Sequence, residues 1–171
     1  VWWQCKHGHE FEVSVSTRTL NKSGCRTCWF LSNSSYPEQR VAYFVKQLFP
    51  DTIQSHRPSF LKGLELDMYI PSLNTAIEYD GEYFHQDKKR DIKKTLMCQR
   101  NGVRIIRIRE SGCPDISKYC ETLTTDAKNI SDLDRVIVQL LQLLGVSNVQ
   151  LNFSEFTRDD WNKFKDQYMD I

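Results

Sequence analysis

The stretch LELDMYIPSLNTAIEYDG, residues 64–81, contains two short extended patterns separated by a turn. Residues 64–70 alternate between apolar and polar side chains, and Pro71 to Asn74 has the composition of a turn. Residues 75–79 are largely apolar but include Glu78. The pattern therefore predicts two neighbouring strands, with Asp67 on the first and Glu78 on the second.

The flanking segments alternate between helical and extended patterns. Apolar residues at helical spacing predict helices over residues 35–49 and from about residue 87 to residue 101. Residues 52–56, TIQSH, and residues 103–109, VRIIRIR, predict two further strands. The order of helix, three strands, helix and strand predicts an α/β fold, a three-layer sandwich with a mixed central sheet.

The C-terminal part of the chain is predicted to be mainly helical. A leucine-rich stripe over residues 131–144 predicts an amphipathic helix that ends at Gly145. Residues 146–171 predict a short strand and a final amphipathic helix that carries Trp161 and Phe164. No chemistry is assigned to this last segment.

Length and composition suit one domain with a small appendage. The chain has 171 residues, of which 40% are hydrophobic, and no apolar run is long enough to span a membrane. Without a secretion signal, we expect an intracellular protein, in the cytoplasm or the nucleus. The first residue is Val, so we expect the chain to be part of a longer one, and its oligomeric state is left open.

The first thirty residues contain two pairs of metal-binding residue types. Cys5 and His9 form one pair, and Cys25 and Cys28 form a C-x-x-C pair. Zn²⁺ favours four nitrogen and sulfur ligands, and closed sites of this kind are structural. His7 is an alternative ligand to His9, and disulfides are a further alternative that the absence of a secretion signal disfavours. The alternating residues 10–16, EFEVSVS, predict a hairpin strand between the pairs.

This segment resembles a family of small zinc-ribbon domains often joined to nuclease-like domains. The matching pattern is W-x-C-x-x-G-H-x-F, followed by R-T and G-C-x-x-C, over about the first thirty residues. The resemblance implies a zinc ribbon that contacts nucleic acid. Residues 31–35, LSNSS, are predicted to be a linker, so we divide the chain into a ribbon at 1–33 and a second domain at 34–171.

The second domain combines acidic strand residues with a basic segment. Nine of the residues from Lys88 to Arg109 are basic, and only Asp91 is acidic. Neighbouring strands lie about 5 Å apart, so Asp67 and Glu78 could share a divalent ion such as Mg²⁺ or Mn²⁺. Carboxylates for a metal beside cations for a phosphate backbone are typical of phosphodiester cleavage, and His85 has the chemistry for proton transfer.

The ordered set of residues resembles the PD-(D/E)xK nuclease superfamily. It is most similar to the branch with very-short-patch-repair endonucleases and Glu/Asp/His homing-type endonucleases, over roughly residues 36–110. The resemblance implies a restriction-endonuclease-like fold. It implies catalytic roles for the following residues: Glu38, Asp67, Glu78, Asp80, His85 and Lys94. Asp80 stands where the superfamily has a lysine, so His85 or Lys94 would have to supply that role.

Each candidate residue also has a purely structural interpretation. Glu38 could form a capping box with Ser35, and Asp67 and the Asp80-Gly81 pair could serve turns. Glu78 could pair with an arginine. Asp91 and Lys94 could be an ordinary helix pair at i, i+3.

We therefore expect a metal-dependent DNA endonuclease with structural Zn²⁺, catalytic Mg²⁺ or Mn²⁺, and DNA as its partner. The zinc ribbon would assist DNA binding. The alternative is a nucleic-acid-binding module with a nuclease-like fold and no catalysis. A third interpretation is a protein-contact domain that uses the leucine-rich helix.

Overall fold

The computed structural model describes residues 1–126 and 128–169, and its contacts separate two compact units. The first unit combines residues 1–36 with the segment from Phe156 onward, and the second comprises Pro37–Glu155. From the sequence, the C-terminal segment was predicted to belong to the second domain, residues 34–171. The contacts group it with the first unit, because the Tyr36 ring stacks on Phe156 at 6.1 Å and Arg158 lies over the same Tyr36 ring.

The first unit pairs a small hairpin with short helices. Strands β1 (Trp2–Gln4) and β2 (Glu10–Glu12) are antiparallel, and α1 (Val15–Thr19), α2 (Arg26–Asn33) and α6 (Arg158–Met169) complete the unit. The predicted strand over residues 10–16 is only partly confirmed. It ends at Glu12 because Ser14 caps α1, with its hydroxyl accepting from the Thr17 N–H. The predicted linker is also shorter, since α2 continues to Asn33.

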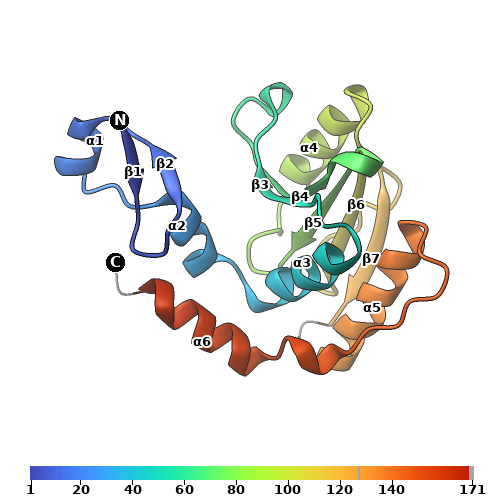
Figure 1. Ribbon diagram of the computed structural model, residues 1–171. Coiled ribbons are helices and arrows are strands. Elements are labelled where there is room, and N and C mark those ends of the chain that lie inside the picture. The colour runs from blue at the N-terminus through green and yellow to red at the C-terminus, as the bar shows by residue number, and fades with distance from the viewer. Residues whose placement is uncertain (127, 170–171) are drawn as a thin grey trace. The chain divides into compact units, whose positions relative to one another are not determined.

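The second unit follows the predicted order of elements closely (Figure 1). Its helices and strands are α3 (Tyr36–Leu48), β3 (Ile53–His56), the 3-10 turn η1 (Ser59–Leu61), β4 (Leu66–Ile70), the 3-10 turn η2 (Pro71–Leu73), β5 (Thr75–Asp80), α4 (Lys88–Arg100), β6 (Arg104–Glu110), β7 (Glu121–Thr125), α5 (Ile130–Leu143) and the 3-10 turn η3 (Phe153–Glu155). Strand β7 was not predicted, and η3 takes the place of the predicted short strand.

The five strands form one mixed sheet in the order β3-β4-β5-β6-β7. The pairs β3–β4 and β4–β5 are antiparallel, whereas β5–β6 and β6–β7 are parallel. A parallel pair needs a crossover connection, and α4 supplies it between β5 and β6. The prediction of an α/β fold with a mixed sheet is confirmed.

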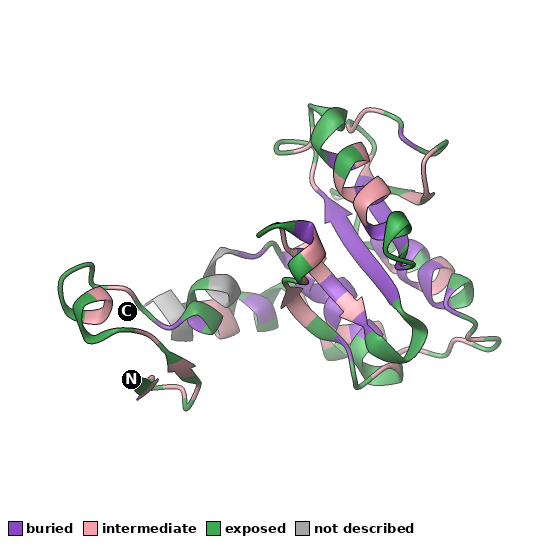
Figure 2. Ribbon diagram, turned by 90° about the horizontal axis from the view of Figure 1, so that it is seen from above, coloured by how far each residue is buried: buried purple, intermediate pink, exposed green. Residues whose placement is uncertain are grey.

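The central strands are buried on both faces (Figure 2). Every residue of β5 is buried, as are Ile105 to Arg109 of β6. One face packs against α4, where Cys98 joins Ala76 and Ile105 in a buried cluster. Helices α3 and α5, which carry buried apolar stripes of their own, contact each other through Arg40 and Asp134. No helix among the described residues is long and apolar enough to cross a membrane.

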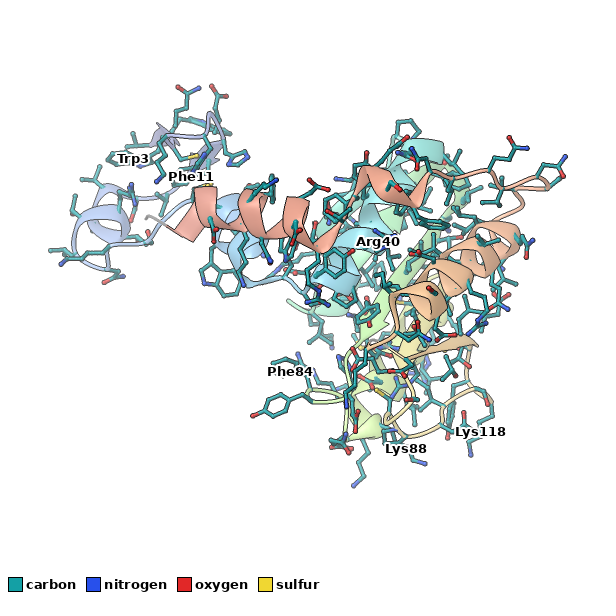
Figure 3. The ribbon with its side chains drawn as sticks, turned by 90° about the horizontal axis from the view of Figure 1, so that it is seen from below. Trp3, Phe11, Arg40, Phe84, Lys88 and Lys118 are labelled. Atoms are coloured by element: carbon teal, nitrogen blue, oxygen red, sulfur yellow. The ribbon has the colours of Figure 1, made fainter. Side chains whose placement is uncertain are left out.

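Arg40 ties α3 to α5 and to η3. Its Nε donates to Asp134 Oδ1 at 2.8 Å, and its Nη2 donates to the Phe153 carbonyl at 3.1 Å. The guanidinium lies 5.2 Å from the ring centre of Phe44 and 5.3 Å from that of Phe153 (Figure 3). The side chain is almost fully buried, so its charge depends on these partners.

We expect Arg40→Ala to lower the free energy of unfolding by about 3 kcal/mol, because it leaves Asp134 without its buried cation. Urea unfolding followed by circular dichroism would measure the loss. Arg135→Ala is the matched control, because Arg135 pairs with Asp132 at the surface of the same helix. Arg135→Ala should lower the free energy of unfolding by about 1 kcal/mol or less. Equal losses from both variants would contradict a special role for the buried pair of Arg40 and Asp134.

Candidate functional site

The first unit brings the four predicted zinc ligands together. Cys5 Sγ lies 3.5 Å from His9 Nδ1 and 3.6 Å from Cys28 Sγ. His9 Nδ1 also lies 3.3 Å from Cys28 Sγ and 3.7 Å from Cys25 Sγ. None of the six cysteines, all of which belong to the described part of the chain, forms a disulfide. The ligand set therefore contains His9 and not His7.

These spacings fit a tetrahedral zinc site. Zinc lies about 2.3 Å from thiolate sulfur and about 2.0–2.1 Å from imidazole nitrogen, which places neighbouring ligand atoms about 3.5–3.8 Å apart. The four distances within the cluster, 3.3 to 3.7 Å, fall in or near that range. The cluster Cys5-His9-Cys25-Cys28 could therefore hold zinc.

The electrostatics of the thiols point the same way. Burial, together with hydrogen bonds to Cys5 and Cys25, raises the pKa of Cys28 to about 12. In the absence of a cation, a second thiolate is thus disfavoured in this cluster. A divalent cation would remove that penalty, since metal-bound cysteines are deprotonated.

The predicted carboxylate pair lies where β4 and β5 separate. Their ladder ends with Met68 opposite Ile77, and continuing this register places Asp67 opposite Glu78. There, side-chain oxygens replace the strand-to-strand backbone bonds. The Tyr79 N–H donates to Asp67 Oδ2 at 2.8 Å, and the Asp67 N–H donates to Glu78 Oε1 at 3.3 Å. The two carboxylates are therefore level and close, as the sequence predicted.

Lys94 reaches this pair from α4. Its ammonium forms a short ion pair with Glu78 Oε2, and its side chain is 13% exposed against 2% for Glu78. Arg107 Nη2 lies 3.7 Å from the same Glu78 oxygen. The interpretation of Asp91 and Lys94 as an ordinary helix pair is wrong, because each has a partner elsewhere.

This arrangement disfavours the ionised form of Asp67. Burial is the main cause that raises its pKa well above the usual range, and the negative charge of Glu78 adds to it. Lys94 opposes this increase, whereas the charge of Glu38 on α3 adds to it. Glu38 is therefore near enough for its charge to act on Asp67.

A second cluster lies next to the first, at the ends of β5 and β6. Arg107 donates to both oxygens of Asp80, at 2.7 and 2.5 Å, and Arg109 forms a short ion pair with Asp80 and a 3.0 Å bond to Asp91. His85 Nδ1 lies 3.0 Å from Asp91 Oδ1 and 3.3 Å from Asp80 Oδ1.

The charges of this second cluster are already matched. The ligand atoms of Asp80, His85 and Asp91 lie within 4.8 Å of one another, so they could in principle hold a metal ion. Two guanidinium groups bond the same two carboxylates, however, and would repel a divalent cation. Burial opposes ionisation of Asp91, but the His85 hydrogen bond and the charge of Arg107 lower its pKa to about 2.

The structure thus divides the six predicted catalytic residues into two groups. Asp67, Glu78 and Lys94 form one, with Glu38 acting on it electrostatically. Asp80 and His85 belong to the other, where Asp80 is an arginine partner.

Arg107 and Arg109 were not singled out by the sequence analysis. Both arginines belong to the strand VRIIRIR, where alternation places residues 107 and 109 on one face. The parallel register pairs Glu78 with Arg107 and Asp80 with Arg109. Two buried acids at alternate positions of one strand, followed by two alternate arginines in the next, are the signal that could have identified this pairing.

The loop between β5 and α4 presents two aromatic rings beside His85. Tyr83 and Phe84 are 86% and 84% exposed, and their rings meet edge to face at 4.9 Å. Figure 3 shows Phe84 extending away from the sheet. Large exposed apolar side chains of this kind are available to a binding partner.

Comparison with known proteins finds no matching family model, curated protein or solved structure.

We expect purified protein to contain about one zinc ion per chain, measured by elemental analysis, because the four ligands complete one tetrahedral site. Cys28→Ser should reduce the zinc content to near zero and expose the amides of residues 1–30 to rapid hydrogen exchange. Cys120→Ser is the control, since Cys120 lies in the second unit, and it should leave the zinc content unchanged. Full zinc retention in Cys28→Ser would exclude this site.

Asp67→Asn should stabilise the folded protein near neutral pH when divalent cations are absent. Below about pH 3.5 the group is protonated in both folded and unfolded chains, so it makes no difference there. As the pH rises, the unfolded chain ionises freely while the raised pKa of Asp67 penalises ionisation in the folded chain, and stability is lost. Asn stays neutral and can still accept from the Tyr79 N–H.

We therefore expect Asp67→Asn to raise the free energy of unfolding by about 1 kcal/mol or more at pH 7.5 and to leave it unchanged at pH 3.5. Urea unfolding at both pH values would measure the difference. Asp51→Asn is a control of opposite sign, because the Ser72 N–H lowers the pKa of Asp51. A pH-independent gain from Asp67→Asn would show that burial of its charge is not the cause.

Proposed function

We propose that the second unit is a metal-dependent DNA endonuclease and that the zinc cluster of the first unit assists DNA binding. The observation that carries the proposal is the charge balance around Asp67. Three cations, Lys94, Arg107 and Arg109, bond the following three carboxylates: Glu78, Asp80 and Asp91. Asp67 is a fourth carboxylate, and none of the ion pairs found among the described residues includes it.

A divalent cation is the natural partner for this arrangement. Asp67 and Glu78 would hold Mg²⁺ or Mn²⁺, and the charge of Glu38 would favour it further. Bound there, the ion would supply charge neutralisation at a phosphodiester and an acidified water. The order of elements, with these acids on two adjacent strands, supports a restriction-endonuclease-like fold of the PD-(D/E)xK type.

The chain's own residues have separate roles in this proposal. Lys94 takes the place of the lysine that Asp80 replaces, because its ammonium already lies at Glu78 and would face the scissile phosphate. His85 moves a proton on the attacking water or the leaving group, and Asp91 orients its ring through Nδ1. Asp80 holds the arginines and His85 in place.

Two features support nucleic acid as the substrate. The exposed rings of Tyr83 and Phe84 adjoin His85, and aromatic rings stack on bases irrespective of sequence. Lys88 and Arg90 follow directly at the start of α4, and such residues attract a phosphate backbone.

One observation favours the alternative, a nucleic-acid-binding module that does not cut. Glu78 and Asp80 already have cations in contact, so a metal would have to share Glu78 with Lys94. In this interpretation Asp67 stays protonated and the site is a stable part of the fold. Binding and cleavage measured on the same variants distinguish the two.

We expect the protein to nick or cut supercoiled plasmid DNA with Mg²⁺ or Mn²⁺ and not with EDTA. Asp67→Asn, Glu78→Gln and Lys94→Met should each reduce the rate at least about 100-fold, the contribution expected of one positioned group. Glu121→Gln is the control, because Glu121 forms an exposed pair with Arg104 in the same unit and should retain full activity.

The same variants should keep DNA binding in filter assays at low salt. Loss of cleavage with binding retained would place the chemistry on these residues. If the unchanged protein binds DNA but cuts none with either metal, the endonuclease is excluded and the binding module remains.

A further inference from the structure

The outer side of α4 forms an apolar groove with the segment that follows β3. Its floor consists of Leu61 and Leu64 on one side and Ile92, Leu96 and Met97 on the other. The groove is open and has a volume of about 730 Å³. Leu61 is fully buried beneath it, whereas Ile92, Leu96 and Met97 are only half-buried. The groove therefore leaves part of its apolar lining accessible to a partner.

Four cations surround this floor. Lys62, Lys89, Lys93 and Arg100 line the groove, and no acidic residue does. All four are exposed, and none forms an ion pair with any residue that the structure describes. An apolar floor with a rim of one charge sign is complementary to an amphipathic partner of the opposite sign.

Lys62 lies where the chain turns at the edge of the groove. Lys62 ends η1 in the left-handed region, with φ at 52°, next to Gly63 at 92°. A lysine adopts this conformation less easily than glycine or asparagine would. A lysine stands there nonetheless, and it places a positive charge at the edge of the groove.

The groove lies on the opposite side of α4 from the carboxylate clusters. Asp91, Lys94 and Cys98 face the sheet, at helical spacing. Ile92, Leu96 and Arg100 follow each other at i, i+4 and i+8 and are rotated away from that face by roughly half a turn. The groove is thus a separate surface from the proposed nuclease site, and its function does not depend on that site.

We propose that this groove docks an acidic amphipathic helix of a partner protein. From Lys89 to Arg100 the cations span about 16 Å of α4, the length of about three turns of a partner helix. Apolar residues at i, i+3, i+4 and i+7 of that helix would contact Leu64, Ile92 and Leu96. Its acidic residues would meet the rim. A phosphate backbone would pair with the rim but leave the apolar floor without a partner.

The probe is a synthetic fifteen-residue amphipathic peptide with leucines at i, i+3, i+4 and i+7, glutamates on the opposite face and alanines elsewhere, labelled for fluorescence anisotropy. We expect it to bind at least about tenfold tighter than the same peptide with lysine in place of glutamate, and than one with alanine in place of leucine. Methyl NMR signals of Ile92, Leu96 and Met97 should shift on titration.

Two variants of the full chain test the two parts of the groove. Lys93→Glu/Arg100→Glu reverses the charge of two rim residues. Leu96→Lys removes part of the apolar floor and leaves the rim cations in place. Each variant should lower the affinity for the acidic peptide at least about tenfold. Lys88→Glu is the matched control, because Lys88 is exposed on the same helix but does not line the groove, and it should change the affinity little. Circular dichroism checks that all variants are folded.

Three outcomes would overturn the proposal. The first is equal binding of the acidic and basic peptides. The second is unchanged affinity in either groove variant. The third is that the acidic peptide does not bind, whereas a duplex oligonucleotide shifts the same methyl signals and binds less well to Lys93→Glu/Arg100→Glu. That result would make the groove a nucleic-acid surface.

Discussion

The buried ion pairs between Asp80, Arg107 and Arg109 are the interaction on which the second unit depends. Charges inside a protein are costly unless they are closely matched, and removing one partner leaves the other uncompensated. These pairs fix β5 against β6, and the bond from Arg109 to Asp91 fixes α4 above both. The position of Lys94 on Glu78, and the outward direction of the apolar groove, follow from how this network orients α4.

The sheet has to open beside this network for the carboxylates to meet. β4 and β5 stop pairing at Met68 and Ile77, and the side chains of Asp67 and Glu78 then accept the backbone N–H groups that the ladder no longer uses. The two carboxylates that accept these backbone N–H groups are thereby brought close together, so their negative charges repel each other. Local structure and site electrostatics therefore have one cause, and the raised pKa of Asp67 is the energetic cost of the arrangement.

Periodicity was sufficient to predict most of the second unit, because its strands and helices have strong patterns. Strand β7 was missed because ETLTT has little apolar alternation and is defined by its parallel pairing with β6. Spacing predicted the three cysteines of the zinc-type cluster and left His9 or His7 as the fourth member, and the structure has His9 there. The arginine partners of Asp80 could not be found that way, since the pairing depends on the β5–β6 register, which no local pattern specifies. The pairing of Lys94 with Glu78 depends likewise on the rotation of α4.

The two units differ in how the chain passes through them. The second is one continuous segment, whereas the first is assembled from both sides of it, with Tyr36 stacked on Phe156. In topological terms the second unit is an insertion, and its entry and exit points are held close together by that aromatic contact. Units with adjacent ends tolerate circular permutation and transplantation between hosts. During synthesis the metal ligands, all within the first 28 residues, emerge long before the helix that completes their unit.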